Sequence, residues 1–151
     1  MRKHLASIGI AAAFLLTAVM ASHAQSEAPK SSGGPALDGY CPVAYVEMKQ
    51  AVKGDPKHKS EHAGHTFHFA NAQAKQMFDQ APAKYLPAYD GLCATGVSMG
   101  MKLESDPKLF TLHNGRTYLF SDANAKAMFE KDRAGIVAKA DANWPKIKQQ
   151  K

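Results

Sequence analysis

An internal repeat is the feature that most limits what this chain can fold into. When the sequence is aligned with itself at an offset of 51 residues, positions 62–79 match positions 113–130 with nine identities in 18 pairs. Asp55-Pro56-Lys57 also recurs at this offset, and the segment that ends at Cys41 recurs at an offset of 52. Self-similarity that keeps its order along the chain predicts two copies of one unit, residues 37–89 and residues 90–144.

Each copy is predicted to form a β-hairpin followed by a helix. Glycine-centred turns at positions 63–64 and 114–115 separate two extended stretches, and the second stretch alternates between two faces. Asn71 and Asp122 stand where an N-cap is expected, directly before apolar residues with helical spacing. The expected fold class is therefore α+β.

The two copies are expected to form one domain. A unit of about 50 residues buries too little surface to be stable alone, so we expect the copies to pack face to face around a pseudo-twofold axis. The aromatic residues of both copies are then predicted to share one core, made of Phe67, Phe69, Phe78, Tyr118, Phe120 and Phe129, with Trp144 as a lid.

The first 24 residues are typical of a secretory signal peptide. A basic start is followed by the apolar residues 5–20 and by small residues at positions 22 and 24. Because this apolar stretch is shorter than the roughly 20 residues that span a bilayer as a helix, no membrane span is expected after leader cleavage. Residues 25–36 are predicted to be a flexible linker, residues 37–145 the domain and residues 146–151 a tail. The mature protein is then periplasmic or secreted.

Three stretches of the domain carry a resemblance to a known family. They are GYCPVAY at 39–45, TFHFANA at 66–72 and AKADANWP at 138–145. In these stretches the chain resembles exported bacterial proteins of the YHS domain family, and the resemblance extends from about residue 38 to residue 145. YHS domains are similar to the small thiolate metal-binding modules of copper chaperones and heavy-metal pumps. The resemblance therefore implies two tandem YHS-like units that bind or sense a metal.

The chain departs from the family pattern at the positions of the thiols. In the family one Cys follows a Pro-Val pair, and two more, four residues apart, follow the aromatic strand. Here Cys41 precedes the Pro-Val pair. The strand-end positions hold Ala70 and Ala74 in the first copy and Ser121 and Ala125 in the second. Neither copy contains the three thiolates of the family site.

Cys41 and Cys93 hold equivalent places in the two copies, so their chemistry depends on whether those places meet. If they meet, the two sulfurs form either a disulfide or a two-thiolate site for a soft ion, copper first and zinc second. If they do not meet, two unlinked buried thiols remain. In the metal-binding hypothesis, Met99, Met101 or His65 completes the set of ligands.

The remaining sequence features narrow the function. The chain has no Cys-x-x-Cys pair, no His-Glu-x-x-His and no glycine-rich phosphate loop, so no enzyme is expected. The net charge of +6, or +4 without the leader, is spread along the chain and predicts no nucleic-acid partner. We expect an exported protein that binds or traffics a soft metal, with a metal donor or acceptor protein as its partner. The alternative is a structural or interaction module with a disulfide between the two cysteines or with unlinked buried thiols.

Overall fold

The computed structural model describes residues 34–150 and has a mixed α+β fold. The first half contains the 3₁₀ helix η1 (Ala36–Gly39), α1 (Pro42–Glu47), β1 (Asp55–His62), β2 (His65–Phe69), α2 (Ala72–Gln80) and α3 (Pro82–Tyr85). The second half contains η2 (Ala88–Gly91), α4 (Ala94–Ser98), β3 (Asp106–His113), β4 (Arg116–Phe120), α5 (Ala123–Lys131) and α6 (Arg133–Ile147). The predicted signal peptide and most of the predicted linker lie outside the described residues.

Each half contains one two-stranded antiparallel sheet, β1 with β2 and β3 with β4. Ala63 and Gly64 turn the first hairpin with φ of 50° and 80°, and Asn114 and Gly115 turn the second with φ of 49° and 75°. Positive φ at both central residues is the tight turn that matches the twist of a hairpin, which explains why glycine stands there. The predicted hairpins and their turns are confirmed.

A helix follows each hairpin and begins at the predicted N-cap. The side chain of Asn71 accepts a hydrogen bond from the Ala74 N–H at 2.8 Å, and that of Asp122 accepts one from the Ala125 N–H at 2.8 Å. The Ala125 N–H, with help from Ser121, holds the pKa of Asp122 below its usual range. Both caps satisfy an N–H that the first turn of a helix leaves without an intrahelical partner.

The aromatic residues form two cores, so the predicted single shared core is wrong. In the first half the Phe78 ring lies 5.2 Å from that of Phe67 and 5.0 Å from that of Phe69. In the second half the Phe129 ring lies 5.0 Å from those of Tyr118 and Phe120. α2 packs on the first hairpin and α5 on the second. The aromatic face of each hairpin is therefore buried within its own half.

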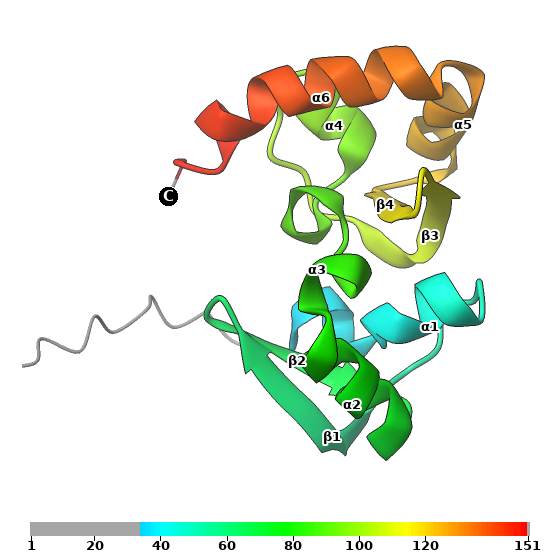
Figure 1. Ribbon diagram of the computed structural model, residues 1–151. Helices are drawn as coiled ribbons and strands as arrows, with labels where there is room; N and C mark the ends of the chain where they lie inside the picture. Colours follow the sequence, from blue (N-terminus) through cyan, green and yellow to red (C-terminus); the bar gives the residue numbers. More distant parts are fainter. Residues whose placement is uncertain (1–33, 151) are drawn as a thin grey trace, which may run out of the picture.

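Tyr45 of α1 connects the two halves. Its side chain is fully buried, its hydroxyl donates to the Pro107 carbonyl at 2.7 Å, and its ring lies 4.8 Å from that of Phe110. Burial raises the pKa of Tyr45 above its ordinary value. In the second half, 52 residues on, Val97 packs into its own core instead. The contact is therefore one-sided, with α1 of the first half lying against β3 of the second (Figure 1).

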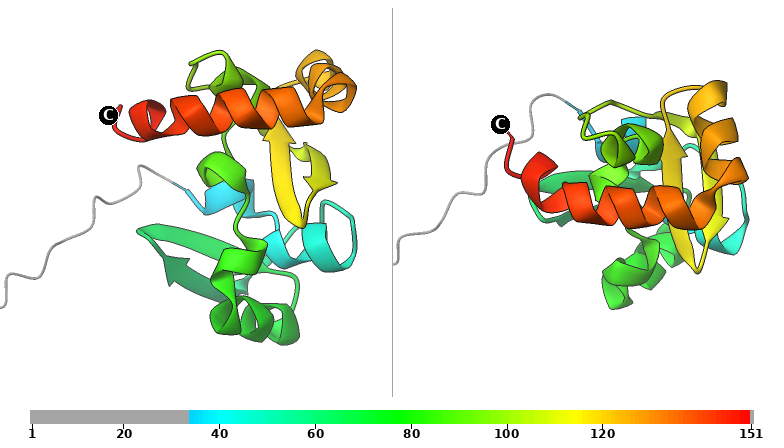
Figure 2. Two further views of the ribbon diagram at one scale, coloured as in Figure 1. Left: turned by 45° about the horizontal axis from the view of Figure 1, so that its top comes forward. Right: turned by 90° about the horizontal axis from the view of Figure 1, so that it is seen from above.

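Helix α6 distinguishes the second half from the first, where α3 has only four residues. α6, orange to red in Figure 2, extends across the second half and packs on α4. Ile147 at its end is buried in the second core, so ordered packing continues past the boundary expected at residue 145. Trp144 contacts Tyr89 edge-on at 5.6 Å. Within residues 34–150, no helix combines the length and the apolar character needed to cross a membrane.

Candidate functional site

Cys41 lies at the start of α1 and lines a pocket of about 270 Å³. The chain enters the helix through Pro42, which suits the first helical position because its missing N–H is not needed there. Cys41 belongs to the first core and is fully buried as a residue. Its sulfur accepts no capping hydrogen bond from α1. The side chains of Asn71, Cys93 and Asp122 each accept one at the start of their helices. The Cys41 thiol therefore has no capping role in α1 and can interact with a ligand in the pocket.

The pocket lies between α1, the end of β2 and α2. Two thioethers share it with the thiol, because Met48 follows α1 directly and Met77 projects from α2. Ala70 and Ala74 also line it, and these are the positions to which the family resemblance assigns thiols. The full lining is Cys41, Val43, Ala44, Glu47, Met48, Ala70, Asn71, Gln73, Ala74 and Met77. Small alanines leave room, and three of the lining side chains, Cys41, Met48 and Met77, carry sulfur.

Glu47 is the one ionisable carboxylate in this lining, and it already has partners. Its Oε1 accepts from Lys84 Nζ at 2.7 Å and from the Tyr85 hydroxyl at 2.9 Å. These two hydrogen bonds, with that from Lys84 the larger influence, hold the pKa of Glu47 below its usual range. The carboxylate therefore links α1 to α3 at the rim of the pocket.

Cys93 begins α4 as Cys41 begins α1, but its sulfur is engaged. It accepts hydrogen bonds from the Gly96 N–H and from the Ser121 hydroxyl, both at 3.4 Å. Next to it, the buried Thr95 hydroxyl donates to the Ala125 carbonyl at 2.7 Å and ties α4 to α5. These contacts hold Cys93 inside the second core.

The structure does not bring the predicted ligands together. Cys41 and Cys93 are free thiols in different cores, so the disulfide alternative is not the arrangement found. Met99 and Met101 are exposed and are not in the lining of the Cys41 pocket. Among residues 34–150 no group of three or more His, Cys, Asp or Glu side chains is arranged to hold a metal ion.

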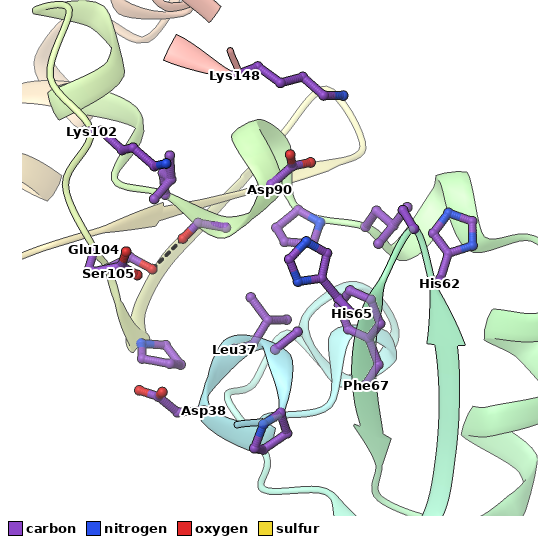
Figure 3. A pocket seen from close by; sticks show the side chains of 18 of the residues that line it. Leu37, Asp38, His62, His65, Phe67, Asp90, Lys102, Glu104, Ser105 and Lys148 are labelled. Atoms are coloured by element: carbon purple, nitrogen blue, oxygen red, sulfur yellow. Dashed lines mark hydrogen bonds between the residues drawn. The ribbon is translucent and has the colours of Figure 1, made fainter. Parts of the chain in front are cut away.

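His65, one of the three residues proposed to complete the metal site, shares a strand face with Phe67 and Phe69 but does not line the Cys41 pocket. Phe67 and Phe69 are buried, whereas His65 is exposed at the tip of the hairpin. Position 65 pairs with His62 in the last rung of the ladder, next to the turn of the hairpin. His65 lines a second and larger pocket between the two halves (Figure 3).

Sequence reasoning missed Met77 as a functional candidate. The residue was assigned to the helix by its spacing, and helical methionines usually fill cores. A signal was nevertheless present, because positions 70, 74 and 77 lie within two turns of one another and two of them are the family's thiol positions.

Searches of family models, of curated proteins and of solved structures found no match to this chain.

Proposed function

We propose that this is a small exported protein that binds a soft metal ion, cuprous copper, at Cys41 with Met48 and Met77. One observation supports the proposal above the others: a thiol without a capping hydrogen bond and two thioethers line the same pocket. Thiolate and thioether sulfurs are the ligands that favour Cu(I) over harder ions. The fit rests on the chemistry of this donor set.

The same donor set argues against zinc as the main cargo. Zinc sites in proteins have four ligands drawn from Cys, His and carboxylates. This pocket supplies one thiol, and its carboxylate, Glu47, is engaged by Lys84 and Tyr85. Cuprous ion accepts thioethers, which zinc sites rarely use.

The position of Met48 suits exchange of the ion with another protein. Its side chain is 54% exposed while Cys41 is fully buried, so the donor set extends from the core to the surface. A metal donor or acceptor protein would meet the exposed thioether first. The protein would then pass an ion between periplasmic or secreted partners.

We also propose that the two halves are tandem YHS-like units, arranged around an approximate twofold axis. Two observations support this: the elements recur in the same order, and Leu37 of η1 lies against Gly91 of the equivalent η2. A β-carbon at Gly91 would lie 2.8 Å from Leu37 Cδ2, and φ of 85° at this position favours glycine because other residues adopt it only with strain. The one-sided contact of Tyr45 limits how closely the axis is obeyed.

The test is a competition for Cu(I) under anaerobic, reducing conditions with bicinchoninate as the coloured competitor. The purified protein is expected to withdraw one equivalent of Cu(I), and Cys41→Ser is expected to abolish this. Cys93→Ser is the matched control, because it changes the same residue type at the start of the equivalent helix. Absence of copper binding in the wild type would overturn the proposal and favour the non-metal module with unlinked thiols. Binding that is unchanged in Cys41→Ser would overturn the assignment of the site to Cys41.

The Met77 thioether is tested by comparison with Met128, its equivalent in the second half. Met77→Leu is expected to weaken Cu(I) binding roughly tenfold, which corresponds to about 1.4 kcal/mol. Met128→Leu, 51 residues on in α5, changes an exposed methionine outside the pocket lining and should leave the affinity unchanged. Equal effects of the two substitutions would remove Met77 from the proposed ligand set.

A further inference from the structure

A pocket with a volume of about 760 Å³ lies between the two halves. Both halves line it: η1 and the tip of the first hairpin on one side, η2, residues 102–107 and the end of α6 on the other (Figure 3). This volume is typical of sites for small organic ligands. We call this pocket the central groove.

The charges of the central groove are separated. In Figure 3 the side chains of Lys102 and Lys148 stand at one end of the groove and that of Asp38 at the other, with Glu104 between them along the left wall. Asp90 lies near the lysine end. None of these five residues forms a salt bridge with another residue of the described segment. Lys102 Nζ donates to the Gln150 carbonyl at 2.9 Å, but no acidic side chain of the described residues neutralises either lysine.

Apolar side chains occupy the space between the charged ends. Leu37 and Phe67 stand in the middle of the view, beside the His65 ring, and Trp144 lines the wall from α6. The Lys148 ammonium lies 5.8 Å from the centroid of the Trp144 ring, which keeps it at the rim of the groove. An occupant thus meets two lysines with Asp90 near them at one end, an apolar middle, and Asp38 at the other end.

The backbone holds both aspartates in an uncommon conformation. Asp38 has φ of 49° and Asp90 has φ of 53°, each preceded by another residue with positive φ. A left-handed conformation at a residue other than glycine costs on the order of 1 kcal/mol. The cost recurs at equivalent places in both halves, and it turns both carboxylates to the surface of the groove rather than into either core.

We propose that the central groove binds a short peptide with free ends. The peptide carboxylate lies at Lys102 and Lys148, the peptide ammonium at Asp38, and an apolar side chain against Leu37 and Phe67. A simple anion leaves Asp38, Asp90 and Glu104 unmatched, and a simple cation leaves both lysines unmatched. Only a ligand with both charges at its two ends satisfies the whole groove. The site does not involve Cys41, so it is independent of the proposed copper site.

Trp144 provides the readout, because it is the single tryptophan of the chain and lines the groove. The purified protein, kept copper-free with a chelator, is titrated with the tripeptide Ala-Leu-Ala while Trp144 fluorescence is followed. The peptide is expected to change the fluorescence with saturation. Its N-acetylated and C-amidated forms are each expected to bind at least tenfold more weakly.

Two variants assign the ends of the peptide. In Asp38→Asn the N-acetylated and free peptides are expected to bind equally, because the partner of the ammonium is gone. In Lys148→Gln the penalty for C-amidation is expected to shrink, with Lys102 retaining part of it. Glu61→Gln and Lys139→Gln are the matched controls, since both residues are exposed and lie outside the groove. No saturable response up to millimolar peptide, or blocked and free peptides that bind the wild type equally, would overturn the proposal.

Discussion

The two halves contain the same elements in the same order, yet their cysteines face different surroundings. Cys41 lines a pocket with two methionines, and its sulfur receives no capping hydrogen bond. The sulfur of Cys93 accepts from Ser121 and from a backbone N–H. Equivalent positions in a repeat thus support different chemistry.

Two residue differences explain the contrast. Ser121 in the second half corresponds to Ala70 in the first, at an offset of 51, so only the second cysteine has a hydroxyl partner there. Thr95 corresponds to Val43 at an offset of 52, and its hydroxyl ties α4 to α5. The Ser121 hydroxyl therefore gives Cys93 a hydrogen-bond partner that Cys41 lacks, and the Thr95 hydroxyl links α4 to α5 within the second half.

The largest expected effect tests whether the cores are separate. Phe78→Ala and Phe129→Ala each remove the central ring of one core and should lower the free energy of unfolding by about 3–5 kcal/mol. Urea unfolding followed by circular dichroism measures the loss. The milder pair Phe78→Leu and Phe129→Leu should be additive within about 0.5 kcal/mol, and a larger coupling would show that the cores act as one.

Tyr45→Phe tests the junction between the halves. It removes the donor to the buried Pro107 carbonyl and should cost about 1–3 kcal/mol of unfolding free energy. Tyr85→Phe is the control, because the Tyr85 hydroxyl donates to the exposed Glu47, which keeps Lys84 as a partner. If both substitutions cost the same, the Tyr45 hydrogen bond has no special role in joining the halves.

Alkaline pH is expected to destabilise both halves. Burial raises the pKa of Tyr45, and burial together with the hydrogen bond to Asp141 raises that of Tyr89. The unfolded chain ionises these hydroxyls near pH 10 while the folded chain keeps them protonated, so stability is complete below pH 10 and falls above it. The expected slope is about 1.4 kcal/mol per pH unit for each such tyrosine. Urea unfolding at pH 9 and pH 11 measures it, and an unchanged midpoint would contradict the assignment.

The smallest expected effect comes from removing the Thr95 and Ser121 hydroxyl groups, which the first half lacks at the equivalent positions. Thr95→Val removes one buried hydrogen bond and should cost about 1 kcal/mol. Combined with Ser121→Ala, it leaves the Cys93 sulfur with one hydrogen bond, that from the Gly96 N–H, and a second equivalent of Cu(I) is expected if the proposed copper site is correct. Thr66→Val, at a half-buried strand position, is the control and should change the unfolding free energy by less than about 0.5 kcal/mol. A variant that still binds one equivalent would show that these two hydroxyls do not control metal binding.

Much of the local structure could be predicted because its causes lie within a few residues. The hairpin turns need positive φ, which glycine at 64 and 115 permits, and the helices begin where Asn71 and Asp122 can accept an N–H. The candidate site could be predicted only in part. Cys41 was predicted as a ligand and lines a pocket, whereas Met77 in the same lining was not predicted as one. Met99, Met101 and His65 lie outside this pocket.

The sequence by itself determined the two hairpins, the starts of the helices that follow them and the likeness of the two halves, because turns, caps and periodicity act between near neighbours. Only the tertiary structure decided that each helix closes on its own hairpin, that the cysteines occupy separate cores and that charged residues of both halves surround a central groove. These features depend on which surfaces meet. They rest on contacts between residues far apart in the chain, such as that of the Tyr45 hydroxyl with the Pro107 carbonyl.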